Sequence, residues 1–261
     1  MSSSGRFVWH DLVTTDVEGA KAFYSALLGW TYVPFTGPDG EPMAGEMGEY
    51  PMIQAEGGAM PQGGIMAAQQ PGVPPHWLGH VALPDVDEVA ERAAANGGTV
   101  LFGPFDIPMV GRNVLLADPQ GAALGIITFA GEPMPAPEGD LPAGSFVWDE
   151  VVTTDVEGAK AFYATVTGWS AHEWAGEVEY TLFQVGEQDA AGLMALPDEM
   201  QSPPAWMAYV NVDDAAATAA KAGELGGMVH AGPFPVPGIG QIAVIGDPQG
   251  AVLGLIQPEM A

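Results

Sequence analysis

FVWHDLVTTDVEGAKAFYSALLGW, residues Phe7–Trp30, decides the fold because the chain contains this stretch twice. The second copy, FVWDEVVTTDVEGAKAFYATVTGW, covers Phe146–Trp169, and seventeen of the twenty-four aligned positions are identical. Another stretch repeats in the same order, DPQGAALGII at Asp118–Ile127 and DPQGAVLGLI at Asp247–Ile256. An internal repeat of this kind indicates a tandem of related domains. The positions at which the copies differ are therefore the first place to look for chemistry.

The composition excludes several classes of partner. The 261 residues include six Lys and Arg against 33 Asp and Glu, which gives a net charge of −27. Nucleic acids and anionic membranes bind basic patches, so we expect neither as a partner. The absence of cysteine excludes disulfides, thiolate metal sites and cysteine nucleophiles. The N-terminus shows no signal peptide and no apolar run reaches the ~20 residues of a spanning helix, so we expect a soluble, cytoplasmic protein.

Local patterns predict the same order of elements in both copies. Phe7–Val13 is apolar and aromatic and predicts a strand, and apolar residues spaced by three and four then predict a helix. Thr15 and Glu18 fit the capping box that begins a helix, and Gly29 is placed to end it in a left-handed conformation. The order β-α-β-β-β is predicted twice in each copy. We therefore expect an α+β fold built from four βαβββ modules.

The boundary between the copies follows from composition. The stretch GEPMPAPEGDLPAGS, residues 131–145, has no apolar periodicity and contains several prolines, so it predicts a linker. The predicted domains are residues 1–130 and 146–261.

Two motifs carry a resemblance to a known family. The pattern T-x-D-x-x-x-A-x-x-F-Y-x-x-x-x-G occurs at Thr14–Gly29 and Thr153–Gly168, and DPQG occurs once in each copy. In these motifs the chain resembles the vicinal-oxygen-chelate superfamily, which includes glyoxalase I, extradiol dioxygenases, and bleomycin- and fosfomycin-resistance proteins. The tandem is most similar to two-domain actinobacterial members described as glyoxalase-like or as hydroxylases. The resemblance implies that each pair of modules curls its sheets around a cleft.

The resemblance also implies where a metal ion would bind. Its ligands on the first, fifth and last strands of each copy fall on Trp9, Trp148, Leu78, Met207, Gly125 and Gly254. The fourth-strand acid would lie in GGIM (63–66) or AGLM (191–194), which contain no acid. None of these residues can ligate a divalent ion. We therefore expect no metal and no other cofactor, although the sequence leaves open a non-standard site that uses His10, His76 or His80.

The catalytic candidates follow from strand alternation, which places residues i and i+2 on one face. Asp11 then shares the face of Trp9, and the pseudo-symmetry of the modules predicts that Asp11 lies near His80 and that Glu150 lies near Tyr209. A carboxylate beside an imidazole is a plausible general acid/base pair. The alternative is structural: the two carboxylates accept hydrogen bonds from backbone groups or from the tryptophan indoles.

The ligand-binding candidates are aromatic or basic. Trp9, Trp148, Trp77 and Trp206 are paired across the copies and can form flat apolar walls for a planar ligand, or can simply pack in the core. Arg112 can capture an anionic group, and its alternative is a salt bridge.

Three classes of function remain. The first is a metal-independent enzyme that acts by acid/base chemistry on a small, largely apolar metabolite, through an isomerisation, a cyclisation or a hydroxylase-associated step. The second is a protein that sequesters an aromatic small molecule. The third, a metal-dependent lyase or dioxygenase, has the least support. We expect a small-molecule ligand and a monomer or a homodimer.

Overall fold

The structure is a computed structural model that describes residues 4–37, 50–69, 72–131, 141–176, 178–197 and 202–259. Within these ranges no helix is both long enough and apolar enough to cross a membrane. Most of the predicted linker, residues 132–140, lies outside the described residues.

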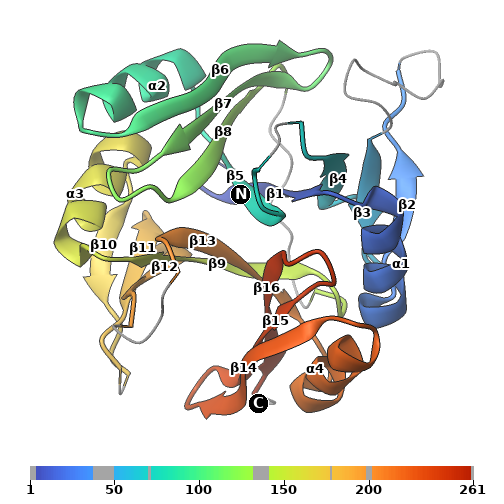
Figure 1. Ribbon diagram of the computed structural model, residues 1–261. Helices are drawn as coiled ribbons and strands as arrows, with labels where there is room; N and C mark the ends of the chain where they lie inside the picture. The colour runs from blue at the N-terminus through green and yellow to red at the C-terminus, as the bar shows by residue number, and fades with distance from the viewer. Residues whose placement is uncertain are drawn as a thin grey trace. The chain divides into compact units, whose positions relative to one another are not determined.

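Four modules follow one another along the chain (Figure 1). The first consists of β1 (Phe7–Thr14), α1 (Val17–Leu28), β2 (Thr31–Pro34), β3 (Pro51–Gln54) and β4 (Gly63–Ala67). The second consists of β5 (His76–Ala82), α2 (Val86–Ala95), β6 (Thr99–Ile107), β7 (Gly111–Ala117) and β8 (Ala123–Phe129). The third consists of β9 (Phe146–Thr153), α3 (Val156–Thr167), β10 (Ser170–Glu173), β11 (Thr181–Val185) and β12 (Gln188–Ala195). The fourth consists of β13 (Ala205–Asn211), α4 (Ala215–Glu224), β14 (Met228–Val236), β15 (Gly240–Gly246) and β16 (Val252–Pro258). The predicted α+β fold of four βαβββ modules is confirmed.

All four modules share one strand topology. The first strand pairs in parallel with the last, and the other strands follow in antiparallel order, as in β2-β3-β4-β1 and β5-β8-β7-β6. The second copy repeats this with β10-β11-β12-β9 and β13-β16-β15-β14. The parallel register sets four residues of the first strands opposite glycines: the pairs are Asp11–Gly64, His80–Gly125, Glu150–Gly192 and Tyr209–Gly254.

The helix ends follow from local chemistry, with one correction to the prediction. The N-cap of α1 is Asp16, whose Oδ1 accepts a 2.9 Å hydrogen bond from the backbone N–H of Gly19. The predicted capping box of Thr15 and Glu18 is therefore wrong, and Glu18 instead pairs with Lys21 at 2.8 Å. Asp85, Asp155 and Asp214 cap the other three described helices in the same way. The predicted left-handed end of α1 is confirmed at Gly29, whose φ is 70°.

The chain forms two compact units that do not coincide with the two sequence repeats. Unit one consists of Met1–Val8, Leu78–Pro137 and Trp148–Met207, so it combines the second and third modules. Unit two consists of Trp9–Trp77, Glu138–Val147 and Ala208–Ala261, so it combines the first and fourth modules. In unit one α2 contacts α3, and in unit two α1 contacts α4 (Figure 1). Each compact unit therefore takes one module from each repeat, and the division into two repeat domains stays a prediction.

Each unit has its own hydrophobic core, and residues of both repeated motifs meet in it. In unit two the buried Tyr24 hydroxyl donates to Asp247 Oδ2 at 3.2 Å and accepts from Trp77 Nε1 at 3.2 Å. In unit one Tyr163 bonds to Asp118 at 2.9 Å and Trp206 Nε1 donates to the Tyr163 hydroxyl at 2.8 Å. The tyrosine of the F-Y motif in one repeat is thus bonded to the aspartate of DPQG in the other repeat.

Candidate functional site

A hydrogen-bonded cluster of Trp9, Tyr50 and Asp11 lies on the first module. Trp9 and Asp11 share a face of β1, as the strand alternation predicts, and Tyr50 comes from the residue before β3. The indole N–H of Trp9 donates to the Tyr50 hydroxyl at 2.7 Å and to Asp11 Oδ1 at 3.0 Å. The Tyr50 hydroxyl in turn donates to the same carboxylate oxygen. Asp11 is buried, so these donors compensate a carboxylate that has been removed from water.

The third module carries the same arrangement, formed by Trp148, Tyr180 and Glu150. The Trp148 indole donates to the Tyr180 hydroxyl at 2.8 Å, and that hydroxyl is hydrogen-bonded to the buried Glu150. We call these two groups the Trp–Tyr–carboxylate clusters. They bear out the structural alternative for Asp11, because an indole does donate to its carboxylate, but they do not test a catalytic role.

The protonation of the two tyrosines follows from their surroundings. Burial, followed by the charge of Asp11 and the hydrogen bond to it, raises the pKa of Tyr50 well above its ordinary value near 10. Burial and the neighbouring Glu150 raise the pKa of Tyr180 in the same direction. Both phenols therefore stay protonated at neutral pH and act as hydrogen-bond donors to the carboxylates.

An aromatic ring covers a glycine on the last strand of every module. Tyr50 lies against Gly64 of β4, and Tyr180 lies against Gly192 of β12. On the other two modules, His80 lies against Gly125 of β8 and Tyr209 lies against Gly254 of β16. A Cβ atom at any of these glycines would overlap the ring. The rings therefore fill the space that a longer side chain on the last strand would need.

These contacts test whether the metal site implied by the fold family fits this chain. The implied last-strand acid falls on Gly125 and Gly254, where His80 and Tyr209 leave no room for a side chain. Across the described ranges, no group of three or more His, Asp and Glu residues is arranged to hold a metal ion. The rings of His10 and Phe146 are stacked at 3.9 Å, and His76 Nδ1 lies 2.8 Å from the carbonyl of Pro74. The residues present do not fit the family's metal ion.

His80 has a partner that the sequence analysis did not identify. Its Nδ1 lies 3.1 Å from Nδ2 of Asn113 on β7, and both side chains are buried, with 5% and 2% exposed. Asp11 belongs to unit two and His80 to unit one, and Tyr209 and Glu150 are divided between the units in the same way. The predicted pairs Asp11–His80 and Glu150–Tyr209 stay predictions.

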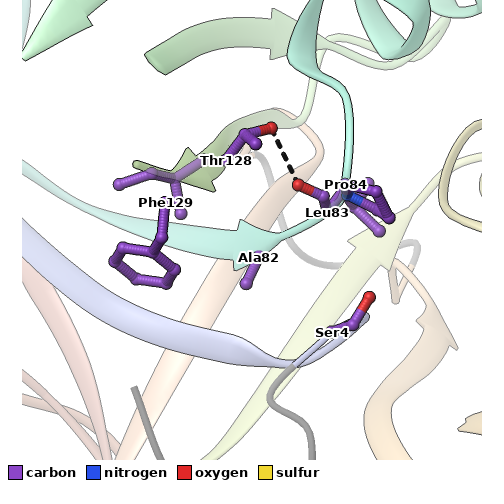
Figure 2. A pocket seen from close by; sticks show the side chains of 7 residues that line it. Ser4, Ala82, Leu83, Pro84, Thr128 and Phe129 are labelled. Atoms are coloured by element: carbon purple, nitrogen blue, oxygen red, sulfur yellow. Dashed lines mark hydrogen bonds between the residues drawn. The ribbon is translucent and has the colours of Figure 1, made fainter. Parts of the chain in front are cut away.

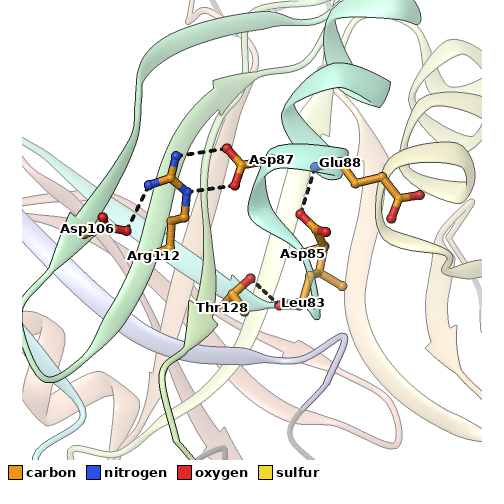
Figure 3. Close-up of polar contacts among 7 residues, drawn as sticks. All are labelled: Leu83, Asp85, Asp87, Glu88, Asp106, Arg112 and Thr128. Atoms are coloured by element: carbon orange, nitrogen blue, oxygen red, sulfur yellow. Dashed lines mark hydrogen bonds and ion pairs between the residues drawn. The ribbon is translucent and has the colours of Figure 1, made fainter.

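The remaining ligand-binding candidates have structural contacts. Trp77 and Trp206 are buried in the two cores, each hydrogen-bonded to a core tyrosine, which is the packing alternative. Figure 3 shows Arg112 bridging two acids: its Nε and Nη2 bind Asp87 at 2.8 and 3.0 Å, and its Nη1 binds Asp106 at 2.9 Å. The salt bridge proposed as the alternative for Arg112 is therefore present. Contact of these residues with a ligand stays a prediction.

A small apolar hollow of about 230 Å³ lies in unit one (Figure 2). Its walls include Ala82 at the end of β5 and Ile127, Thr128 and Phe129 at the end of β8. The Thr128 hydroxyl donates a 2.8 Å hydrogen bond to the Leu83 carbonyl. Because this hydroxyl is already bonded, the hollow offers a ligand a mainly apolar surface.

The residues that the sequence analysis missed are Tyr50, Tyr180 and Asn113. The two tyrosines could have been found from the sequence, because both lie in a short motif that the repeats share, E-Y-x-x-x-Q, at residues 49–54 and 179–184. Asn113 could have been found as a position at which the repeats differ, because the second repeat has the apolar Ile242 there.

The fold agrees with comparisons to known proteins. The Glyoxalase/Bleomycin resistance protein/Dioxygenase superfamily matches residues 6–126 and 145–255, and the chain belongs to this family. It is 38% identical to the "Putative glyoxylase CFP32" of Mycobacterium tuberculosis over 96% of this chain and 94% of that protein. It is 28% identical to the "Anthracycline biosynthesis protein DauV" of Streptomyces sp. over 97% of this chain and 93% of that protein. The Mn(II)-bound glyoxalase from Novosphingobium aromaticivorans shares the fold, with a TM-score of 0.65 at 14% identity over 98% of this chain and 83% of that one.

Proposed function

We propose that this protein acts on a small, largely apolar metabolite by acid/base chemistry that does not use a metal ion. The observation that carries the proposal is the set of rings over the last-strand glycines. At the positions where the family implies an acidic metal ligand, this chain has glycine, and His80 and Tyr209 fill the adjoining space. The chemistry then depends on the titratable side chains themselves, as in general acid/base catalysis.

The names of the relatives support an aromatic substrate. Two related proteins are named for anthracycline biosynthesis, and an anthracycline has a planar, fused-ring core. A planar compound suits Trp9 and Trp148, which are half-buried and held in place by the hydrogen bonds of their indole N–H groups.

In the proposed reaction the buried carboxylates and His80 transfer protons. Asp11 or Glu150 removes a proton from a carbon next to a carbonyl group, and the proton returns at another atom, so the net reaction is an isomerisation or a cyclisation. Tyr50 and Tyr180 stay protonated and donate hydrogen bonds, which stabilise the carboxylate form. His80 and Tyr209 are the further acid/base candidates.

The test begins with protein purified without chelator. Native mass spectrometry identifies any small molecule that stays bound, and elemental analysis measures Zn, Ni, Mn and Fe. The retained molecule is then incubated with the protein in D₂O and EDTA, and NMR follows the entry of deuterium. We expect deuterium entry that EDTA does not slow and that either Asp11→Asn or Glu150→Gln reduces about 100-fold or more, the usual contribution of a general base. A near-stoichiometric metal whose removal stops the exchange would contradict the proposal.

Sequestration of an aromatic molecule is the second candidate. The hydrogen bonding of Asp11 favours this candidate. Its Oδ1 already accepts two hydrogen bonds from protein groups, which suits a structural role better than proton transfer. For a protein of this kind, the retained molecule quenches tryptophan fluorescence on binding, is recovered without deuterium, and is unchanged after prolonged incubation.

A further inference from the structure

One face of the sheet in the second module is directed away from its helix. Arg112 on β7 reaches Asp87 on α2, so it lies on the helix side of the sheet. Val81 and Val114 belong to the core on that side. Because neighbouring residues in a strand point to opposite faces, His80 and Asn113 lie on the other face. Their hydrogen bond agrees with this placement.

Asn113 has only part of its hydrogen-bonding capacity satisfied on this face. Its Nδ2 faces His80 Nδ1 at 3.1 Å, so the amide donates and the ring nitrogen accepts. Among the residues that the structure describes, its Oδ1 has no hydrogen-bond partner, although this atom is buried and the residue is only 2% exposed. A buried acceptor without a partner costs stability, and such atoms are rare in folded proteins. This pattern is typical of a group that is completed by a ligand.

The apolar hollow described above is lined by the cross-strand neighbour of Asn113, and neither Asn113 nor His80 is itself part of the lining. Ile127, which lines the hollow, is the cross-strand neighbour of Asn113 in the pairing of β7 with β8. Ala82 and Phe129 lie two residues beyond His80 and Ile127 on the same strands, and both line the hollow (Figure 2). By strand alternation, all of these side chains share one face with the buried amide.

The second repeat lacks the polar group at the corresponding place. The positions equivalent to His80 and Asn113 are Tyr209 and Ile242, which occupy the same registers on β13 and β15. A phenol beside an isoleucine has no amide that needs a partner. The pair of His80 and Asn113 is therefore not repeated in the corresponding module of the second repeat.

We propose that Asn113 is a positioning and recognition residue. It holds His80 as the tautomer with the proton on Nε2, and its Oδ1 accepts a hydrogen bond from an O–H or N–H of a ligand whose apolar part lies along Ala82, Ile127 and Phe129. The substrate class is a small aromatic molecule that carries a hydrogen-bond donor. This inference rests on the proposed binding of a small apolar metabolite, but it does not depend on catalysis.

The binding test compares indole with 1-methylindole, because the two probes differ in a single N–H donor. Isothermal titration measures their dissociation constants for the full chain. We expect indole to bind about five- to tenfold more tightly, the effect of one hydrogen bond. Asn113→Leu removes this preference and changes the affinity for 1-methylindole by less than about twofold. Ile242→Leu, at the matching position of the second repeat, keeps the preference.

The tautomer provides a second readout that a merely structural role would not produce. Long-range ¹H–¹⁵N NMR at about pH 9, where an ordinary imidazole is neutral, distinguishes the two neutral forms. We expect the proton of His80 on Nε2, with the signal assigned by His80→Gln. Asn113→Asp replaces the donor that faces the ring by an acceptor, so the proton moves to Nδ1. This readout needs no ligand.

The results that would contradict this inference can be distinguished from those that would contradict the proposed function. Equal binding of the two probes to the wild-type chain, or a preference that survives in Asn113→Leu, overturns this inference and leaves the proposed function standing. If neither probe binds, both proposals lose their support. If the wild-type His80 carries its proton on Nδ1, the amide oxygen faces the ring and Oδ1 is not the recognition atom. Thermal unfolding confirms that Asn113→Leu folds, and we expect only a small change in its melting temperature, because the variant removes the unpartnered Oδ1 but also removes the donor to His80 Nδ1.

Discussion

The absence of a side chain at Gly64 determines which side chains can pack between β1 and β4. Gly64 faces Asp11 in the register of β1 and β4, and the ring of Tyr50 lies where a side chain of residue 64 would be. The phenol can reach the carboxylate only because that space is empty. The identity of residue 64 therefore controls the hydrogen bonding of a residue on a neighbouring strand.

Gly64→Ala tests this control. The new methyl group overlaps the Tyr50 ring, so we expect a loss of about 1–3 kcal/mol in the free energy of unfolding, as in other overpacked sites. Gly223→Ala is the control, because Gly223 lies in α4 with no atom near its Cβ position, and there the change stabilises by about 0.5–1 kcal/mol. Urea unfolding of both variants provides the measurement. Equal effects of the two changes would show that the ring does not limit residue 64.

The buried tyrosines predict a loss of stability at high pH. Burial raises the pKa of Tyr24, Tyr32, Tyr50, Tyr163 and Tyr180 above the value near 10 of the unfolded chain. The unfolded state then ionises first, so this stability is complete below about pH 10 and declines above it, by up to about 1.4 kcal/mol per pH unit for each tyrosine.

Urea titrations between about pH 8 and pH 11, with phenolate absorbance as the second signal, measure this decline. Few other groups titrate in this range, since the chain has only six Lys and Arg. Tyr24→Phe removes one of these five tyrosines and makes the decline shallower. A free energy of unfolding that is constant through pH 11 would rule out the shift.

The candidate site could be predicted from the sequence only where one strand determines it. Alternation along β1 correctly places Trp9 and Asp11 on one face, and the indole N–H does reach the carboxylate. Tyr50, the residue before β3, lies 39 positions from Asp11 in the sequence, and no local pattern predicts that the two side chains meet. Asn113 reaches His80 from a strand more than thirty residues further along the chain, and only the sheet order brings them together.

At the level of elements, the four helices that the structure describes begin in the same way. Each is preceded by an aspartate with extended backbone, and the carboxylate accepts a bond from the N–H three residues later. The carboxylate satisfies a donor that the first turn leaves open, and its charge suits the positive end of the helix. Thr15 precedes the aspartate by one residue and is not the cap.

Substitutions at the start of α1 separate the two capping schemes. We expect Asp16→Ala to lower the free energy of unfolding by about 1 kcal/mol, because it removes the bond to Gly19. Thr15→Ala changes it by less than about 0.5 kcal/mol, as at an ordinary exposed site. Chemical denaturation compares the two variants, and a larger loss from Thr15→Ala would restore the capping box.

The elements themselves were largely predictable, since periodicity and turn residues mark most of them. The exceptions are strands whose partners determine their extent. β6 extends from Thr99 to Ile107 because its pairing with β7 continues through two irregularities in register, which no local pattern marks. β10, from Ser170 to Glu173, is exposed along its length and has no alternating apolar pattern, so its pairing with β11 is the only reason it is a strand.

At the scale of the whole molecule, the chain is divided in one way by sequence and in another by packing. The repeats run from one end to the other, whereas each compact unit and its core take one module from each repeat. The bonds of Tyr24 to Asp247 and of Tyr163 to Asp118 join the repeats within the two cores.

Separate expression of the repeats tests this organisation. Residues 1–130 alone contain Tyr24 and Asp118 but lack the partner of each, and half of each core is missing. We expect neither residues 1–130 nor residues 146–261 to unfold cooperatively as a monomer, and we expect mixing the two to restore cooperative melting. Light scattering and circular dichroism measure this. A monomeric, cooperatively folded single repeat would show that the repeats are independent.

The reciprocal composition of the cores bears on how such a protein can evolve after gene duplication. A substitution of a core tyrosine in one repeat removes a hydrogen-bond partner of the aspartate in the other, so the two copies constrain each other at these positions. We expect that neither copy can be deleted to leave a smaller folded protein. Substitutions cost the least stability on the sheet faces that are turned away from the cores. His80 and Asn113, replaced by Tyr209 and Ile242 in the sister copy, differ on such a face. Duplication has thus left one copy free to specialise while the shared interior keeps the pair inseparable.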